Sequence, residues 1–377
     1  MPAYLDHAAT TPMRPEAVEA MLALLTENYG NPSGSHAVSR QAKKALEEAR
    51  EVVAEALGAR PGEVVFTAGG TEADNLAITG AVAARPGPVL WSAVEHHAVL
   101  HSAENAAKAL GGQVVPVGPD GVVDLDALPR LVGPSTSVVA VMLANNEVGT
   151  VQPLVEVAAV VAEQAPGALV MTDAVQAFQW LDVAALAAAA DLVAVSAHKF
   201  GGPKGVGALV VRGRARLEPL IVGGGQERGL RSGTHNVAGI VAMAAAMAAV
   251  VAERERTVAR VAALRDRLAD GLLAAVEGAQ ETGDRSRKVA GNCHLTFEGV
   301  ESEALLMLLD GAGVCASAGS ACTSGAVEPS HVLSAMGVPR ERGLGALRLS
   351  LGPGTTEAEI ALALEAVPAA VARLREA

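Results

Sequence analysis

The sequence predicts an α/β protein: a large domain with a mostly parallel, seven-stranded sheet, and a smaller α+β domain. Apolar runs rich in β-branched residues recur along the chain, and uniformly apolar runs indicate strands buried on both faces. Alanine-rich segments with helical periodicity, such as Leu154 to Gln164, separate most of these runs, as in a parallel sheet covered by helices. The runs comprise residues 64–66, 89–91, 114–115, 138–143, 169–172, 192–195 and 208–211.

The last two of these runs break the parallel rhythm. A short glycine loop, residues 201–205, and a few neighbouring residues are all that separates them. A parallel connection needs a dozen or more residues, so we expect the final strand to run antiparallel to the one before it.

After Gly233 the sequence changes to long helical stretches, which we predict over residues 237–254 and 257–277. Short strands follow at residues 292–297 and 346–350, and an amphipathic helix closes the chain at residues 357–375. We therefore predict a large domain over residues 16–250 and a small α+β domain built from residues 1–15 and 251–377.

Composition and charge exclude several functional classes. Half of the 377 residues are hydrophobic but only 2% are aromatic, so we expect a core of Val, Leu and Ala side chains with few aromatic ones. The formal charge of −12, without a cluster of Lys or Arg, argues against direct binding to nucleic acid. The apolar span 237–252 is shorter than the roughly 20 residues that a bilayer requires, so we expect a packed helix and no membrane association.

Cysteine usage points to a reduced compartment. The chain has three cysteines, an odd number, and its opening residues lack a basic leader followed by an apolar stretch. We therefore expect no signal peptide, no disulfide framework and a cytoplasmic location.

Polar residues collect where the predicted strands end, which is where open parallel sheets bind ligands. Gly70 and Thr71 follow the first strand and begin a helix, whose free N–H groups would suit a phosphate. A Gly-Thr pair is also a common helix cap without any ligand. Asp173 ends another strand, either as a helix cap or as a partner for a cationic ring nitrogen.

Lys199 follows the next strand, in a chain with few lysines, and its amine can form a Schiff base with an aldehyde. Pyridoxal phosphate has a phosphate, a ring nitrogen and an aldehyde. These three groups match the anion-binding helix start, the acid and the amine described above. His96 is placed to stack on the ring, with a structural histidine as the alternative. Arg348 lies in an apolar strand and needs an anion, either a structural acid or a substrate carboxylate.

Small, turn-favouring residues surround Cys322 and offer it no apolar partner, so we expect an exposed thiol on a loop. Cys293 is typical of a buried strand cysteine, and Cys315 is expected to pack in the small domain. A zinc site from Cys315, Cys322, His331 or His294 lacks the Cys-x-x-Cys spacing that would support it, so no metal is predicted.

The chain resembles the NifS/IscS-like cysteine desulfurases, which belong to the aminotransferase class V family of fold-type I pyridoxal-phosphate enzymes. The resemblance runs nearly end to end. It is most specific at Ser196-Ala197-His198-Lys199, at Arg231-Ser232-Gly233-Thr234 and at Gly319-Ser320-Ala321-Cys322-Thr323-Ser324.

The resemblance implies a role for each matching residue. Lys199 would carry the cofactor, Asp173 would pair with the ring nitrogen, and His96 would stack on the ring. Cys322 would be the nucleophile that receives sulfur from L-cysteine, leaving L-alanine. Further implied roles are the ring hydroxyl for Gln176, the phosphate for Gly70, Thr71, Ser196 and His198, the cofactor of a neighbouring subunit for Thr234, and the substrate carboxylate for Asn146 and Arg348.

Such sharing of Thr234 implies a homodimer. The implied sulfur acceptor is a partner protein, either an iron–sulfur scaffold or a tRNA-thiolation enzyme. A selenocysteine lyase or another class V aminotransferase would share Lys199 and Asp173, and a non-catalytic protein of sulfur trafficking could keep the same fold.

Overall fold

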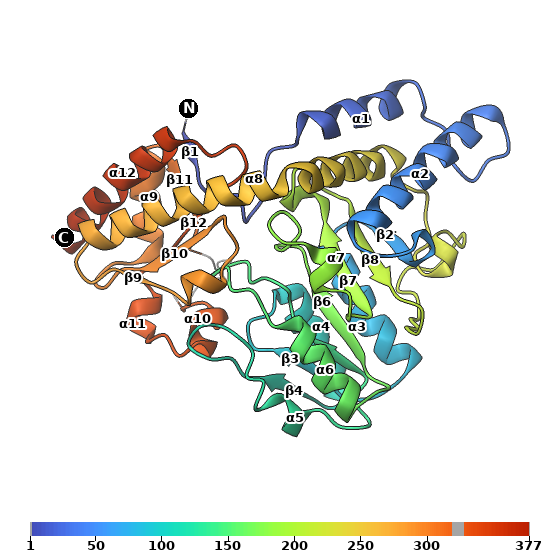
Figure 1. Cartoon of the computed structure of the whole chain (residues 1–377), viewed down its shortest axis with the longest axis horizontal. Coiled ribbons are helices and arrows are strands. Elements are labelled where there is room, and N and C mark those ends of the chain that lie inside the picture. The colour runs from blue at the N-terminus through green and yellow to red at the C-terminus, as the bar shows by residue number, and fades with distance from the viewer. Residues whose placement is uncertain (1, 319–327, 377) are drawn as a thin grey trace.

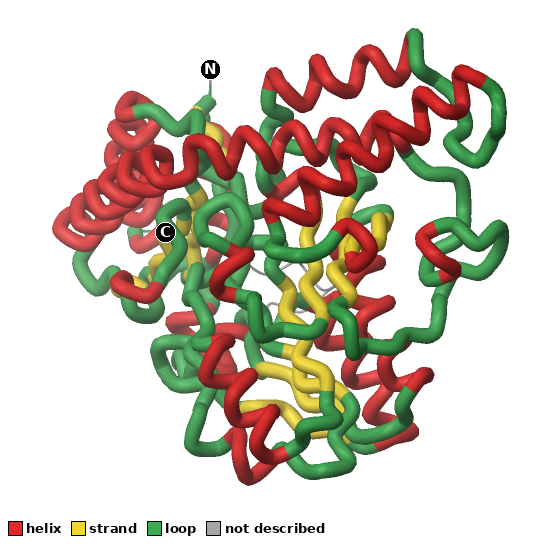
Figure 2. The backbone as a smooth tube through the Cα atoms, turned by 45° about the vertical axis from the view of Figure 1, so that its right-hand side comes forward, coloured by secondary structure: helices red, strands yellow, loops and turns green. Residues whose placement is uncertain are grey.

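The computed structural model describes residues 2–318 and 328–376, and a seven-stranded sheet lies at the centre of its larger part (Figures 1 and 2). The strand order is β2-β8-β7-β6-β5-β3-β4. The strands are β2 (Val64–Thr67), β3 (Val89–Ser92), β4 (Gly112–Val115), β5 (Val138–Ala140), β6 (Leu169–Asp173), β7 (Leu192–Ser196) and β8 (Gly207–Val211).

The direction of the strands confirms the predicted sheet. Strands β3 to β7 pair in parallel, whereas β8 is antiparallel to both β7 and β2. Strand β5 ends at Ala140, three residues earlier than predicted. The chain beyond it still follows β6, because Val141 and Leu143 donate backbone hydrogen bonds to Met171 and Asp173.

Helices cover both faces of this sheet, which explains its uniformly apolar strands. On β2, Val65 packs into one core cluster with α3 (Gly70–Ala84) and α4 (His97–Leu110), while its neighbours Val64 and Phe66 face a second, larger cluster. That larger cluster includes side chains of α2 (Ala37–Ala56), α6 (Leu154–Gln164), α7 (Val183–Leu186), α8 (Val237–Ala275) and the short α5 (Leu128–Leu131).

Helix α8 corrects the prediction for this region. The sequence predicts two helices with a break near residue 255, but a single helix of 39 residues runs from Val237 to Ala275. The apolar pattern changes along it, yet neither Pro nor Gly lies near the expected break, so nothing interrupts the hydrogen-bond ladder. The helix packs against α1 (Pro15–Thr26) and α2 and reaches the small domain, so the predicted boundary at residue 250 falls inside it (Figure 1).

By length and composition alone, α8 could cross a membrane. However, 56% of its most apolar window is buried inside the protein, and the core helix of a soluble protein passes the same test. The helix is therefore weak evidence for a membrane segment.

The second part of the molecule has a three-stranded antiparallel sheet in which β10 (Asn292–Thr296) lies between β12 (Ala346–Ser350) and β9 (Gln280–Glu281). Strands β10 and β12 and the last helix, α12 (Glu357–Arg375), match the predicted elements closely. A parallel pair joins β1 (Ala3–Tyr4) to β11 (Val314–Cys315). The remaining helices are α9 (Ser302–Gly311), α10 (His331–Ala335) and α11 (Arg340–Gly343).

Residues 6–11, which we call the N-terminal strap, connect the two parts at the site. On one side, the Ala8 N–H donates to the hydroxyl of Ser350 on β12. On the other side, the Thr11 N–H donates to the carbonyl of His198, just after β7. The strap therefore crosses the open edge of the large sheet and lies beside the residues predicted to be functional.

Candidate active site

A cavity of about 320 Å³ lies at the carboxyl ends of the parallel strands. Strand β6 ends in it at Asp173 and strand β7 at Ser196, while β12 of the small domain contributes Arg348. The structure thus brings together almost all of the predicted cofactor and substrate residues. The predicted residues that line it are Gly70, Thr71, His96, Asn146, Asp173, Gln176, Ser196, His198, Lys199 and Arg348.

The start of α3 forms one wall of this pocket. The first N–H groups of a helix lack partners within it and carry a partial positive charge, which favours an anion. A side chain at Gly70 would bring its Cβ to 2.8 Å from the Val175 side chain, so only glycine fits here. Ser196 and His198 line the same pocket, and burial lowers the pKa of His198 to about 4, helped by Lys199. His198 is therefore a neutral hydrogen-bonding group at physiological pH.

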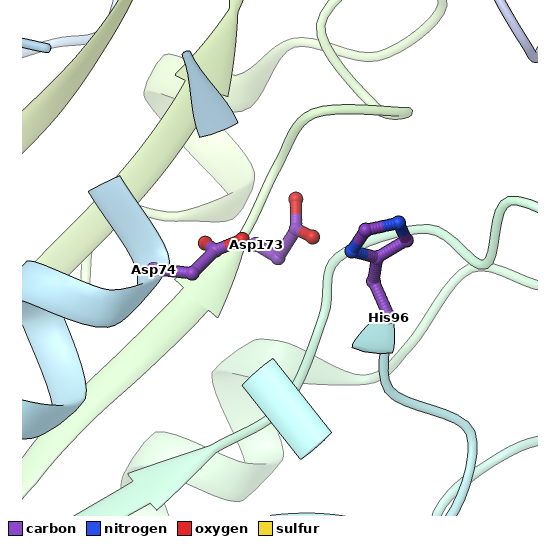
Figure 3. Close-up of side chains that lie close together, drawn as sticks. All are labelled: Asp74, His96 and Asp173. Carbon is purple, nitrogen blue, oxygen red and sulfur yellow. The ribbon is translucent and has the colours of Figure 1, made fainter. Parts of the chain in front are cut away.

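Asp173 is 4% exposed, and its Oδ1 accepts a hydrogen bond from the Val175 N–H at 2.8 Å. Burial raises the pKa of this carboxyl, while His96, the Val175 N–H and Lys199 counteract that rise. Oxygens of Asp173 and Asp74 and a ring nitrogen of His96 all lie within 4.8 Å of one another (Figure 3). Such spacing suits a metal ion or a flat cationic ring, and the nearby anion wall and lysine favour the ring.

Lys199 donates from Nζ to the carbonyl oxygens of Ala8 at 2.5 Å and Ala9 at 3.0 Å, both in the N-terminal strap. Burial and the nearby Arg348, against the opposing effects of Asp173 and Asp6, lower the pKa of this amine to about 8. Near neutral pH a substantial fraction of the amine is therefore unprotonated, which is the form that attacks a carbonyl carbon or removes a proton.

His96 caps the start of α4, where its Nδ1 accepts a hydrogen bond from the Ala98 N–H at 3.2 Å. This contact assigns the ring proton of neutral His96 to Nε2. Burial lowers its pKa, which Asp173 partly opposes. The ring is thus held in one orientation beside Asp173, as the stacking role requires.

Arg348 occupies the side of the pocket formed by the small domain. Its side chain is 5% exposed, and its Nη atoms donate to the carbonyl of Asn146 at 3.0 Å and to Asp6 Oδ1 at 2.8 Å. Its buried Nε has no hydrogen-bond partner within the described part of the chain. The protein therefore holds the guanidinium in one orientation at the wall of the pocket, where its fixed positive charge favours a carboxylate.

One described site residue among those predicted does not line this pocket, and one predicted residue is not described. Thr234 is exposed and does not line it. Cys322 lies outside the described residues. Of the other cysteines, Cys293 is fully buried in β10, where burial raises its pKa to about 12, and Cys315 is half-buried in β11, as predicted.

Sequence reasoning missed four residues that contribute to the site. Asp74 lies one helical turn after Gly70 and lines the pocket, a placement that the helical repeat of α3 would have revealed. The carbonyls of Ala8 and Ala9 and the carboxyl of Asp6 hold Lys199 and Arg348. No local pattern identifies these last contacts, because they depend on where the N-terminal strap crosses the sheet.

The fold and the pocket define a pyridoxal-phosphate enzyme of fold type I. The family model described as aminotransferase class-V matches residues 3–362, and the chain belongs to this family. Among solved structures, a NifS-like protein superposes with a TM-score of 0.93 and 36% identity, covering 99% of this chain and all of that one. The structure of SspA in complex with cysteine gives a TM-score of 0.80 at 30% identity, covering 94% and 99%.

Curated relatives are similar over their full length. The IscS-like cysteine desulfurase of Mycobacterium tuberculosis (strain ATCC 25618 / H37Rv) is 48% identical, covering 100% of this chain and 98% of that protein. The cysteine desulfurase IscS of Methanosarcina thermophila is 43% identical, covering 99% and 92%.

Pyridoxal phosphate is the cofactor of this family, and the pocket fits it. The wall at Gly70 would hold the phosphate, Asp173 would face the ring nitrogen, and Lys199 would reach the aldehyde. Two features of the protein alone support this fit: the close approach of Val175 to Gly70, which keeps this wall free of a side chain, and the buried Asp74 Oδ1, which has no hydrogen-bond partner among the described residues.

Proposed function

We propose that this protein is a pyridoxal-phosphate-dependent cysteine desulfurase. The net reaction converts L-cysteine and the thiol of Cys322 into L-alanine and a persulfide on Cys322. The observation that carries the proposal is the pocket itself, in which an amine of lowered pKa, an anion wall, a buried acid and an oriented arginine lie around one cavity. Relatives at 41–48% identity that carry the name cysteine desulfurase support it.

The residues divide the work by position. Arg348 and Asn146 would bind the carboxylate of L-cysteine, which places the Cα–H near Lys199. Nζ of Lys199 would then take that proton, because a pKa of about 8 leaves the amine able to act as a base near neutral pH. When bound, the cofactor supplies an electron sink, and Asp173 would keep its ring nitrogen protonated.

The sulfur step belongs to Cys322. Its thiolate would attack the sulfur of the substrate, so that a new S–S bond forms as the substrate C–S bond breaks. The electron pair of the broken bond remains with the substrate carbon, which takes up protons to become L-alanine. His96, with its proton on Nε2, is placed to supply a proton at this side of the ring.

The first test is to incubate the purified protein with L-cysteine and a reductant and to measure alanine and sulfide. We expect equal amounts of both and a yellow chromophore that changes when cysteine is added. A protein without this chromophore would favour the alternative, a non-catalytic role in sulfur trafficking.

The Cys322→Ser variant separates a desulfurase from a selenocysteine lyase or another class V aminotransferase. We expect it to lose sulfide and persulfide formation while it keeps the cofactor. The matched control is Cys315→Ser, which alters the half-buried thiol of β11 in the same domain and should keep the activity. Undiminished activity on cysteine in Cys322→Ser would refute the assignment.

We further propose that the protein is a homodimer in which Thr234 reaches the cofactor of the neighbouring subunit. In support, Thr234 is exposed and lies away from its own pocket. Helix α1 also exposes Val18, Leu22 and Leu25 at helical spacing, each about half or more exposed, which is apolar surface suited to a subunit contact. Light scattering should give twice the 38.0 kDa mass of the chain, and a monomer would contradict the proposal.

The sulfur acceptor is proposed as a partner protein in a reducing, cytoplasmic setting, and it is either an iron–sulfur scaffold or a tRNA-thiolation enzyme. The two described cysteines are free thiols, which supports such a setting. Transfer of radioactive sulfur from cysteine to each candidate acceptor distinguishes the two.

A further inference from the structure

Asp74 lies in the floor of the pocket, and neither the sequence prediction nor the proposed mechanism uses it. Its side chain comes from α3, is 1% exposed, and has an Oδ1 without a hydrogen-bond partner among the described residues. Figure 3 shows its carboxyl group beside Asp173, at the end of β6. A carboxyl group so deeply buried and so poorly satisfied costs stability, which calls for an account of what it does.

The surroundings of the two aspartates decide which one carries the charge. Asp173 receives the Val175 N–H and lies near two groups able to hold positive charge, His96 and Lys199. Asp74 also lies within 4.8 Å of the His96 ring nitrogen, but its Oδ1 accepts no hydrogen bond from the described residues, and the charged groups that act on its pKa are Asp173 and Glu95, both acidic.

Burial and these two acids raise the pKa of Asp74 well above its ordinary value. Two buried carboxyl groups within 4.8 Å of each other cannot both be ionised near neutral pH. Asp173 has the Val175 N–H and Lys199 in addition to the shared neighbour His96, so Asp173 is the charged member and Asp74 the neutral one. Glu95 is also buried and its pKa is also raised, chiefly by burial, so it supplies no compensating charge.

We infer that Asp74 is a positioning residue that keeps its proton and donates it, directly or through one water molecule, in a hydrogen bond to the Asp173 carboxylate. This contact would fix the orientation of Asp173 toward the ring nitrogen of the cofactor and keep the negative charge on Asp173 alone. The inference rests on the proposed cofactor, and it extends the site by a second layer that tunes the acid in contact with the ring.

The experiment follows the colour of the bound cofactor as pH is varied, in the absence of any substrate. The visible absorption of lysine-bound pyridoxal phosphate changes with the loss of a proton at the lysine nitrogen, which gives a midpoint pH. A weaker contact between Asp173 and the ring nitrogen raises this midpoint, because the ring then loses its own proton more easily. Loss of a nearby negative charge lowers the midpoint.

Asp74→Asn and Asp74→Ala together test the assignment. Asn is neutral and keeps an N–H donor, so a neutral Asp74 predicts a midpoint within about 0.2 pH units of the parent. Ala removes the donor, so we expect the midpoint to rise by about half to one pH unit and the cofactor to bind about 10-fold more weakly. Ser102→Ala, which removes another buried polar group outside the pocket, is the control and should leave both values unchanged.

Three results would overturn the inference. A midpoint that falls by about one unit in Asp74→Asn would show that Asp74 is ionised. An Asp74→Ala protein that folds with an unchanged midpoint, or a Ser102→Ala protein with the same shift, would show a merely structural role. If Asp74→Ala does not fold, Asp74→Asn still decides between the charged and neutral forms. Absence of cofactor from the parent protein would refute the proposed function instead.

Discussion

Two groups of buried acidic side chains in the large domain differ in what balances the acids. In the first, the Glu227 cluster, Glu227 accepts hydrogen bonds from both Nη atoms of Arg50 at 2.7 and 2.8 Å, from His235 Nε2 at 2.7 Å, and from the Phe66 N–H. In the second, the pocket acids Asp74 and Asp173 lie near the buried Glu95, and none of the three has a direct ion pair to Arg or Lys among the described residues.

The difference separates a structural cluster from a binding site. Burial alone would raise the pKa of Glu227, but His235 and Arg50 outweigh it and lower the pKa to about 2. Burial raises the pKa of Asp173 despite His96 and Lys199 nearby. The Glu227 cluster is complete without a ligand, whereas the pocket acids gain a cationic partner only when a ligand binds.

The largest effect should come from Lys199→Ala, which removes the amine that carries the cofactor and takes the substrate proton. We expect the rate of alanine formation to fall on the order of 10⁴-fold or more. The free energy of unfolding should not fall, because burial disfavours the charged form of this amine, as its lowered pKa shows, and the substitution removes it. The exposed neighbour Lys204 supplies the control, and its replacement by Ala should keep the rate. A substantial residual rate in Lys199→Ala would contradict the assigned role.

Breaking the complete cluster should act on stability instead. Arg50→Met leaves Glu227 buried without its arginine, with only His235 and the Phe66 N–H as partners among the described residues, which should reduce the free energy of unfolding by about 3–5 kcal/mol. Urea denaturation of the two proteins measures this loss. Arg60→Met breaks a pair in which the arginine side chain is 76% exposed, so it should change the free energy of unfolding far less than Arg50→Met does. If Arg50→Met and Arg60→Met reduced the free energy of unfolding equally, the buried Glu227 cluster would not differ from an exposed ion pair.

The depressed pKa of Glu227 predicts a stability loss in acid. Between its unfolded pKa near 4.5 and its folded value of about 2, the unfolded chain binds more protons, so stability falls as pH decreases through this window. The full contribution, about 3 kcal/mol, is present above the unfolded pKa. The free energy of unfolding, measured from pH 6 to pH 2, should show this pH-dependent loss in the parent protein and not in Glu227→Gln. Parallel curves for the two proteins would be the contrary result.

The smallest effect should appear at the anion wall. Thr71→Ala removes one hydroxyl that would contact the phosphate, so the affinity for pyridoxal phosphate should fall about 10-fold, as measured by equilibrium dialysis. The stability of the cofactor-free protein should not change, because Thr71 is exposed there. Thr79→Ala, at an exposed position on the same helix and outside the pocket, should leave the affinity unchanged. If Thr71→Ala lost stability but kept its affinity for pyridoxal phosphate, Thr71 would have a structural role and would not bind the phosphate.

Sequence patterns predicted the elements whose causes are local. The apolar runs identified each strand of the large sheet, and the short glycine loop identified β8 as antiparallel, because loop length limits the connection. The ends of the strands likewise predicted that Asp173 and Lys199 would meet in one pocket. These inferences succeed because strand direction alone brings the carboxyl ends to the same edge.

What depends on distant contacts could not be predicted in the same way. The continuity of α8 depends on packing against α1 and α2, which overrides the change in its apolar pattern. Asp6 joins Arg348 across more than 300 positions of sequence, and the Glu227–Arg50 pair joins positions 177 apart. No periodicity encodes such pairs, because they exist only once the sheet and the N-terminal strap are in place.

The N-terminal strap has a consequence for how this site can vary. Main-chain oxygens of Ala8 and Ala9 receive the hydrogen bonds from the Lys199 amine. Substitutions at these two positions change the shape of the pocket but retain both acceptors. Substitutions in the N-terminal strap can therefore change which substrates fit. The two hydrogen-bond acceptors around the Lys199 amine stay the same, because they belong to the main chain.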